Sequence, residues 1–538
     1  MTLPALAVSF GAVVADDTQE TNKCKSSRSF TSVFTSGGFL LGQVGWHWRP
    51  QPFHPRNFSS LSIPRFQEQQ PARANPEQKP PNSSSQAATP DVTTRENATP
   101  PAAKKESSFF DSGHHSESLP PGWEDNPDFN ITTFGQLPHR EFGYNQFIQV
   151  NEEFKEALRQ MLWQFRAPIR YAFAYGSGVF SQSSPDAPPI PPSLSPHPHP
   201  PEAIVTWQKG GGKIIDFIFG VSYTQHWHSI NLTQHRDHYS FLGTFGSGLV
   251  SWVQDKWGAG VYFNPYITVN GTMIKYGVVN LDTIAEDLSE WKTLYLAGRL
   301  QKPVKILRDD PKVRLANQIN LISAVRAALL MLGPEFTEIE LYNAIAGMSY
   351  LGDPRMRFRS ENPNKVLNIV KNQLPNFRQL YNSLIEDLPN VAYNDARQRS
   401  LSWLNDSSCD CKMVQDMDPV KRGNMVRRLP KAFRKKIYFA YQKKFEIPGQ
   451  QFQEVLEEAK DEDAVGFKRR EGGEFDRRIA REGDIAEVVK KAIGQTVSWP
   501  STSQSLKSFL TAGPGRGMRY LKEKRQKAQE PAKEAKSH

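Results

Sequence analysis

The fold expected of this chain is decided by two stretches of sequence, FAYGSGVF at residues 173–180 and KIIDFIFGV at residues 213–221. In the first, alternating bulky residues predict a strand that runs directly into a Gly-Ser-Gly turn, where missing side chains let backbone N–H groups approach an anion. The second is apolar apart from Asp216, and a carboxylate in a buried strand is costly unless a cation or hydrogen-bond donors compensate it. The pair therefore predicts a phosphate-binding loop beside a metal-binding aspartate.

Two other phosphate-binding motifs fail on spacing. The dinucleotide-binding pattern G-x-G-x-x-G requires a third glycine where Ser181 stands. The KGGGK run at residues 209–213 lacks both the spacing of a P-loop and the hydroxyl residue that follows its lysine. The simpler alternative, an ordinary turn without a ligand, remains open for an isolated Gly-Ser-Gly.

Seven blocks of sequence carry a family resemblance. They occur in order between Phe142 and Val370, and they read YGSGVF, DFIFGV, WHSINL, HYSFL, GAGVYFNPY, IKYGVV and AGRLQKPVKI. A strand, Gly-Ser and then a strand with an acidic residue resembles the polymerase-β-like nucleotidyltransferases, and the seven blocks resemble the mitochondrial phosphatidate cytidylyltransferase family, also called the translocator assembly and maintenance protein family. The resemblance implies an α+β protein with a polymerase-β-like nucleotidyltransferase domain followed by a helical, winged-helix-like domain.

The resemblance also implies a reaction. The phosphate of phosphatidic acid attacks the α-phosphorus of CTP, pyrophosphate leaves, and the CDP-diacylglycerol that remains in the membrane feeds cardiolipin synthesis. Such phosphoryl transfer depends on positioning and charge neutralisation. Asp216, Ser177 and Lys275 are the expected catalytic residues, with Asp216 as the ligand of Mg²⁺. Nucleotide contacts are expected from Gly176, Ser177, Gly178, Tyr276, Arg299, Lys302 and Lys305, and a substrate-phosphate contact from His228.

The chain departs from the superfamily pattern at one position. The second carboxylate normally follows the first by two residues, and here that position is Ile218. The local motif therefore favours a single Mg²⁺, held mostly by triphosphate oxygens, unless Asp186, Asp282 or Asp287 folds in as a further ligand.

The remaining metal-binding side chains do not form a recognisable zinc motif. His226, His228, His235 and His238 lie close together in sequence, but no cysteine or carboxylate pattern completes a tetrahedral site. We expect hydrogen bonding or a phosphate contact from them, with zinc as the weaker alternative. The C-x-C pair at residues 409–411 is expected to be reduced.

Composition divides the chain into five regions. Residues 1–66 are expected to target mitochondria, because residues 23–66 are basic and Ser-rich without an acidic residue, although Asp16, Asp17 and Glu20 are atypical and a disordered Ser-rich tail is the alternative. Residues 67–135 are a polar linker. The nucleotidyltransferase domain spans 136–306 with a Pro-rich insert at 183–201, the helical domain spans 307–500, and a basic tail spans 501–538.

Patterns inside these regions predict particular elements. Asn270-Gly271 between two apolar runs predicts a β-hairpin. A helix capped by Asp282 should follow, and helical periodicity dominates from about Lys312. In the tail, Lys507 and later basic residues alternate with apolar ones such as Leu506 and Phe509, which suits an anionic bilayer, with a solvated basic tail as the alternative.

The net charge of +10 suits anionic partners, here CTP, phosphatidic acid and anionic inner-membrane lipid. No apolar run is long enough for a transmembrane helix, so we expect a peripheral protein on the matrix side of the mitochondrial inner membrane. Two other functions stay open. A nucleotidyltransferase acting on RNA would share the loop and Asp216, but no RNP-type motif or zinc knuckle predicts nucleic-acid binding. A non-catalytic translocase maintenance factor would not need Asp216 behind a glycine loop.

Overall fold

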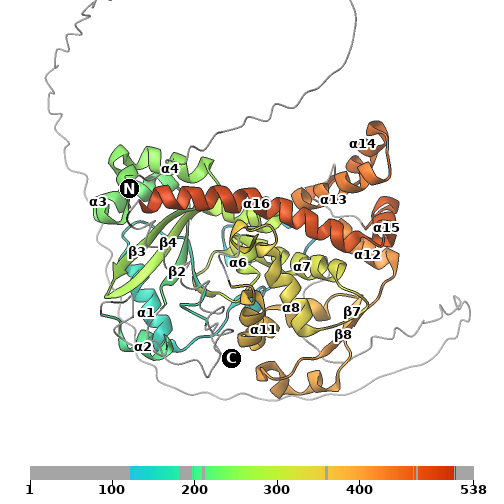
Figure 1. The fold of residues 1–538 in the computed structure, drawn as a ribbon, viewed down its shortest axis with the longest axis horizontal. Coiled ribbons are helices and arrows are strands. Elements are labelled where there is room, and N and C mark those ends of the chain that lie inside the picture. Colours follow the sequence, from blue (N-terminus) through green and yellow to red (C-terminus); the bar gives the residue numbers. More distant parts are fainter. Residues whose placement is uncertain are drawn as a thin grey trace, which may run out of the picture. The chain divides into compact units, whose positions relative to one another are not determined.

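A five-stranded mixed sheet underlies the first half of the fold (Figure 1). The structure, a computed structural model, describes residues 122–125, 127–180, 197, 199–208, 213–357, 362–463, 466–467, 471–513 and 515, all within one compact unit, 103–538. The strand order is β3-β4-β2-β1-β5; β2 and β4 are parallel and the other neighbours are antiparallel. The strands are β1 (Tyr171–Tyr175), β2 (Ile215–Val221), β3 (Tyr262–Val269), β4 (Thr272–Asn280) and β5 (Lys305–Arg308).

The predicted hairpin is confirmed. β3 and β4 are joined by Asn270 and Gly271, whose φ angles of +48° and +72° are those that a tight hairpin turn requires. Gly271 also lies against the backbone of His199, because a Cβ at this glycine would be 1.9 Å from the His199 carbonyl oxygen. The turn and the end of the Pro-rich insert are therefore packed together.

One face of the sheet is covered by α1 (Glu152–Trp163), α2 (Glu202–Gln208) and α3 (Thr224–Gln234). Asn151 caps α1, since its side chain accepts a hydrogen bond from the Phe154 N–H at 3.1 Å. The apolar side of α1 then packs on alternate residues of β1 and β2, which anchors this half of the molecule.

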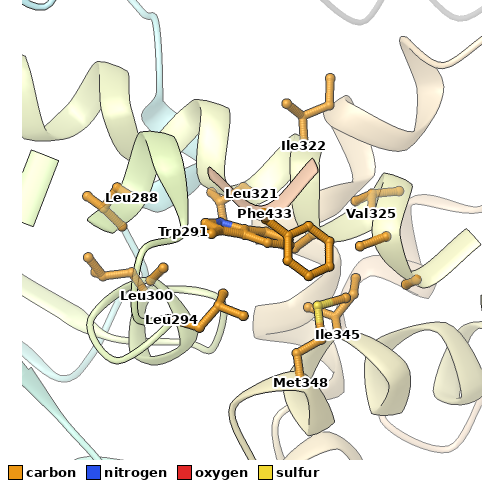
Figure 2. Packing of buried hydrophobic residues seen from close by; sticks show 14 of the residues in the cluster. Leu288, Trp291, Leu294, Leu300, Leu321, Ile322, Val325, Ile345, Met348 and Phe433 are labelled. Carbon is orange, nitrogen blue, oxygen red and sulfur yellow. The ribbon is translucent and has the colours of Figure 1, made fainter. Parts of the chain in front are cut away.

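The opposite face continues without a break into the helices that follow. Residues of α5 (Leu281–Glu290), α6 (Ala297–Leu300) and α7 (Pro311–Met331) share one hydrophobic cluster with the sheet and the later helices. Figure 2 shows its centre, where Trp291 packs against Phe433 with ring centroids 5.2 Å apart. The cap of α5 differs from the prediction, because the side chain of Asn280 accepts the Asp282 N–H, and Asp282 lies in the first turn.

The second half is helical with a small sheet of order β6-β8-β7. Its strands are β6 (Glu335–Thr337), β7 (Val391–Tyr393) and β8 (Lys412–Gln415), with a two-stranded pair β9 (Glu462–Asp463) and β10 (Gly466–Phe467). The remaining helices are α4 (Gly246–Lys256), α8 (Glu338–Gly347), α9 (Pro354–Arg357), α10 (Lys365–Asn372), α11 (Leu374–Glu386), α12 (Pro419–Arg427), α13 (Lys431–Lys444), α14 (Gly449–Glu458), α15 (Glu474–Arg481) and α16 (Ile485–Ala512).

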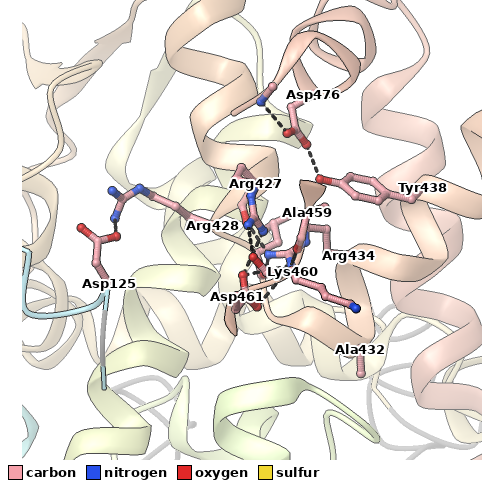
Figure 3. Close-up of polar contacts among 12 residues, drawn as sticks. Asp125, Arg427, Arg428, Ala432, Arg434, Tyr438, Ala459, Lys460, Asp461 and Asp476 are labelled. Atoms are coloured by element: carbon pink, nitrogen blue, oxygen red, sulfur yellow. Dashed lines mark hydrogen bonds and ion pairs between the residues drawn. The ribbon is translucent and has the colours of Figure 1, made fainter. Parts of the chain in front are cut away.

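Buried ion pairs hold this helical half together. Asp461 accepts hydrogen bonds from Arg427 at 2.9 Å and Arg434 at 3.1 Å, as Figure 3 shows. Arg428 reaches Asp125 at 2.8 Å and so fastens the first described residues to α12.

Two boundaries predicted from composition need correction. The linker was expected to reach residue 135, but Glu124 is buried and accepts two hydrogen bonds from Arg326, each of 2.6 Å. Part of the insert is also built into the fold, because buried His197 accepts the Met273 N–H at 2.7 Å through Nδ1. Single long-range contacts of this kind cannot be predicted from the composition of a polar, Pro-rich segment. Residues 1–121, 181–196 and 516–538, with the expected targeting segment, lie outside the described residues.

The start of the expected basic tail is the end of a helix. α16 continues through Pro500 to Ala512, contacting α7 and α13 early and strand β3 late. Lys507 is fully buried, and its ammonium donates to the carbonyl oxygens of Gln254 at 3.1 Å and Trp257 at 2.5 Å. Burial lowers the pKa of Lys507 to about 7. In the part of the chain that the structure describes, no helix combines the length and apolar character needed to span a bilayer.

We expect Lys507→Ala to lower the melting temperature, because two buried carbonyl groups lose their donor at a cost of about 1–3 kcal/mol. Lys490→Ala, an exposed position on the same helix, should have almost no effect. Thermal unfolding followed by circular dichroism compares the two variants. Equal melting temperatures would contradict a structural role for Lys507.

Candidate active site

Three polar side chains form a row across neighbouring strands. Tyr175 of β1 pairs in register with Asp216 of β2, and Asp216 pairs with Lys275 of β4. Lys275 Nζ lies 3.0 Å from Asp216 Oδ1, and the two side chains are 21% and 27% exposed. Because residues at one register position share a face, the row lies on the side of the sheet that faces α5–α7. The structure thus brings Asp216 and Lys275, two of the predicted site residues, into contact.

The glycine turn follows the row directly. Gly176 has φ of +82°, and its carbonyl oxygen accepts the N–H groups of Val179 at 3.0 Å and Phe180 at 2.9 Å. A Cβ at Gly176 would lie 3.4 Å from Asp216 Oδ2, so the carboxylate faces the turn. Gly178 has no room for a side chain, because a Cβ there would be 2.4 Å from the Ile214 carbonyl oxygen. The turn is therefore held tightly beside Asp216.

A second positive group reaches the row from α6. The Arg299 guanidinium stacks on Tyr295, 3.8 Å from the ring centroid, and lies 5.5 Å from the ring centroid of Tyr175. It also donates to the Tyr295 carbonyl oxygen. Tyr175 is thus flanked by Lys275 on its own sheet and by Arg299 from the helices.

Lys302 extends this positive region towards the helical half. Its ammonium donates to Ser349 Oγ at 2.9 Å and lies 5.4 Å from the ring centroid of Tyr350. The Lys365 ammonium lies 5.7 Å from the same ring. Burial, followed by repulsion from Arg299 and Lys365, lowers the pKa of Lys302 to about 7.

A buried carboxylate positions α6. Asp287 accepts hydrogen bonds from four backbone N–H groups in the loop before α6 and at its first residue. The donors are Thr293 at 2.8 Å, Leu294 at 3.0 Å, Leu296 at 2.8 Å and Ala297 at 3.1 Å. These bonds use both carboxylate oxygens, which makes Asp287 part of the framework. The loop, and with it Arg299, is held against the sheet.

Three residues predicted for the site lie on the other side of the sheet. Tyr276 follows Lys275 in β4 and so points to the opposite face, where its hydroxyl meets His238 Nδ1 at 2.9 Å. Lys305 is buried and donates to the Ile148 carbonyl oxygen at 2.8 Å. His228 is enclosed between Tyr239 and Gln254, and burial lowers its pKa to about 4. All three have structural partners and do not reach the row.

Asp216 offers one carboxylate oxygen to a divalent cation. Oδ1 is paired with Lys275, whereas Oδ2 accepts no hydrogen bond from the described residues and faces the glycine turn. Of the expected additional carboxylates, Asp287 is consumed by backbone donors, Asp282 pairs with Lys312 at 2.6 Å, and Asp186 lies outside the described residues. The donor set suits Mg²⁺, which usually keeps few protein ligands when phosphate oxygens supply the rest.

The histidine-rich segment forms a hydrogen-bonded corner of the core. Ligand atoms of His235, Asp237 and His238 lie within 4.8 Å of one another, the one such group found among the described residues. The rings of His235 and His238 stack at 4.4 Å, and buried His238 bonds to the Tyr276 hydroxyl. The Sγ atoms of Cys409 and Cys411 are 3.5 Å apart and not bonded to each other.

Sequence reasoning missed the aromatic residues that hold the cations. Tyr295 lies close to Arg299 in sequence, whereas Tyr350 and Lys365 come from a distant part of the chain. A run of aromatic residues near basic ones is a weak signal for cation–π contacts, because pairing across more than 40 residues depends on the tertiary fold.

The chain matches a known family over most of the described residues. A family model described as mitochondrial phosphatidate cytidylyltransferase matches residues 158–527. The protein of that name from Xenopus laevis is 36% identical over 368 residues, which is 68% of this chain and 92% of the Xenopus protein. Those from Schizosaccharomyces pombe and Saccharomyces cerevisiae are 43% and 40% identical over 47% and 50% of this chain, and these matches span 59% and 65% of the two yeast proteins.

The pKa of Lys302 leads to a prediction for anion binding. A phosphate group beside Lys302 would favour the charged ammonium, so affinity should be full below pH 7 and should fall as pH rises above 7, by up to about tenfold per unit. Calorimetric titration with CTP between pH 7 and pH 9 measures this. Lys302→Arg, which stays charged, should flatten the dependence. The same pH profile in both proteins would mean that Lys302 does not contact the anion.

Proposed function

We propose that this chain, which belongs to the mitochondrial phosphatidate cytidylyltransferase family, transfers a cytidylyl group from CTP to phosphatidic acid. A phosphate oxygen of phosphatidic acid forms a bond to the α-phosphorus of CTP while the bond to the β-phosphate breaks. CDP-diacylglycerol and pyrophosphate are the products. The observation that carries the proposal is the row of Tyr175, Asp216 and Lys275 directly beside the turn at Gly176.

In this proposal the glycine turn and the cationic side chains bind the phosphates of CTP. The turn at residues 176–178 offers backbone N–H groups to the triphosphate, and the Ser177 hydroxyl adds a donor. Lys275 leaves Asp216 for a phosphate oxygen when CTP enters, and Arg299 and Lys302 neutralise charge on the phosphates from the helical side. Positioning and charge neutralisation of this kind are what phosphoryl transfer needs.

Asp216 is the proposed holder of Mg²⁺. Its Oδ2 faces the turn on which the triphosphate would lie, so the carboxylate and the phosphate oxygens could share one ion. When bound, the ion would neutralise charge that develops on the leaving pyrophosphate. Lys275 would then balance the remaining negative charge.

The proposal also covers the type of each domain and the location of the protein in the cell. The mixed sheet with its glycine turn is consistent with a polymerase-β-like nucleotidyltransferase domain, and the small sheet β6-β8-β7 among helices is consistent with a winged-helix-like arrangement. The relatives are named as mitochondrial enzymes, and we place this chain on the matrix side of the inner membrane, where its product would feed cardiolipin synthesis.

The central test is Asp216→Asn. The amide keeps the shape but loses the charge, so CDP-diacylglycerol formation from labelled CTP and phosphatidic acid with Mg²⁺ should fall by at least about a hundredfold. Asp282→Asn is the matched control, since this aspartate also pairs with a lysine but lies exposed in α5. Near-normal turnover of Asp216→Asn would overturn the assignment. Wild-type protein that leaves CTP unused, or that labels RNA instead, would overturn the proposed function.

Ser177→Ala should be milder than Asp216→Asn. The backbone N–H groups of the turn survive, so the loss is one hydroxyl donor, or about 1–3 kcal/mol of transition-state binding. Steady-state kinetics on the same substrates give the ratio of kcat/KM values. A loss as large as that of Asp216→Asn would assign Ser177 a larger role than phosphate contact.

A further inference from the structure

A pocket of about 500 Å³ lies where four segments of the helical half meet. Its walls are the end of α7, the beginning of α12, the end of α15 and the beginning of α16. α12 packs against α7 and α15, α16 packs against α7, and Figure 1 shows α12 and α15 beside the first turns of α16. Ligand sites in proteins commonly have volumes of about 300–1,000 Å³, so this pocket has room for a small molecule.

One wall of the pocket contains a buried cation. Arg422 is 3% exposed, and its guanidinium donates to the carbonyl oxygens of Leu329 and Leu330, at 3.4 Å each. Its other contacts are Gln415 Oε1 at 3.2 Å and Met417 Sδ at 3.5 Å. These contacts cap the end of α7, but most are longer than the usual range of about 2.7–3.2 Å, and every acceptor is uncharged.

The charge of Arg422 has no acidic counterpart in the part of the chain that the structure describes. Burial lowers the pKa of its guanidinium, and Nε donates to no acceptor among the described residues. Glu482 also lines the pocket, but its carboxylate pairs with Lys444 at 2.7 Å. Because a buried charge is costly without a charged partner, an anion in the pocket would stabilise Arg422.

The first turn of α16 supplies a second donor to the same pocket. Asp484 stands at the N-cap but does not cap the helix, because its side chain accepts from the Tyr441 hydroxyl at 3.0 Å and pairs with Lys444 at 2.8 Å. The N–H of Ala486, which lines the pocket, donates to no acceptor among the described residues. The amino end of a long helix carries partial positive charge and favours an anion.

Much of the remaining wall is apolar. Met331, Met417 and Ile485 line the pocket together with smaller apolar residues, and the exposed side chain of Arg481 adds positive charge. Methionine side chains are flexible and adapt to ligands of different shape. The pocket therefore combines anion-binding groups with an apolar lining.

We propose that this pocket, which we call the Arg422 pocket, binds a small amphipathic anion. The ligand class is a carboxylate or a phosphate monoester with a short apolar chain. Its oxygens accept hydrogen bonds from Arg422 and from the first turn of α16, and its chain lies against the methionines. None of the lining residues belongs to the row at Asp216 or to the cations around Lys302, so this is a second site, beyond the proposed function.

The first test is calorimetric titration of the full chain with hexyl phosphate, with hexanoate and with uncharged hexanol. At least one of the two anions should bind at one site per chain, and hexanol should bind at least tenfold more weakly. Binding of only one anion would identify the oxyanion group that the pocket prefers. Failure of both anions to bind, or equally tight binding of hexanol, would overturn the proposal.

Variants then assign the binding to the Arg422 pocket. Arg422→Gln should weaken anion binding at least tenfold, and so should Ala486→Met, which fills the pocket but leaves the contacts of Arg422 with α7 in place. Lys490→Met, at an exposed position of α16, is the matched control for Ala486→Met and should bind like wild type. Lys302→Gln should also bind like wild type, because Lys302 lies outside the pocket.

Thermal unfolding separates lost binding from lost folding. Ala486→Met should keep the melting temperature of Lys490→Met, so its weaker binding cannot be attributed to unfolding, whereas Arg422→Gln also loses the cap of α7 and should melt lower. Wild-type affinity in either Arg422→Gln or Ala486→Met would overturn the proposal. Loss of binding in Lys302→Gln would assign the anion to the candidate active site and overturn it as well.

Discussion

The arrangement of the site depends on a single constraint, the need to compensate Asp216 within the sheet. A carboxylate at this position is tolerable because β4 runs parallel to β2 in the one register that puts Lys275 opposite it, 3.0 Å away. A slip by one residue would turn Lys275 to the other face and leave Asp216 among apolar side chains. The ion pair therefore fixes the register, and the register in turn places Tyr175 and the glycine turn. Because the Lys275–Asp216 pair is partly exposed and lies beside the glycine turn, Lys275 can exchange Asp216 for a phosphate oxygen of a bound anion.

The helix α6 brings the positive charge of Arg299 to Tyr175 of the sheet. Asp287 has no contact with the row, yet its four backbone hydrogen bonds determine where α6 begins, and α6 presents Arg299 to Tyr175. Lys302 and Lys365 share the ring of Tyr350, so repulsion among the cations is accommodated by aromatic faces. Such a cluster is electrostatically unfavourable by itself, and an anion would relieve it. Burial is the main cause of the lowered pKa of Lys302, and repulsion from Arg299 and Lys365 lowers it further.

The sequence predicted the strands and turns on which the candidate site lies. Alternation, the glycine turn and the lone aspartate located β1, β2 and Asp216, and Asn270-Gly271 located the hairpin. The errors came from side-chain direction and from long-range packing. Adjacent Lys275 and Tyr276 could not both face one ligand, because strand residues alternate between faces. Nor could composition reveal that Glu124 pairs with Arg326 or that Lys507 is buried, since both depend on partners far away in the chain.

The long helix α16 joins the two halves mechanically. It packs against α7 and α13 at its start and holds β3 through Gln504 and Thr511 near its end, so the halves cannot separate without bending it. Pro500 interrupts its hydrogen-bond ladder, and the hydroxyls of Thr502 and Ser503 return to the carbonyl oxygens of Ser498 and Trp499, a local pattern that favours bending. α16 thus links the two halves, and Pro500 is the position along it where the helix bends most easily. Any relative motion of the two halves would be a rotation about Pro500, with both attachments intact.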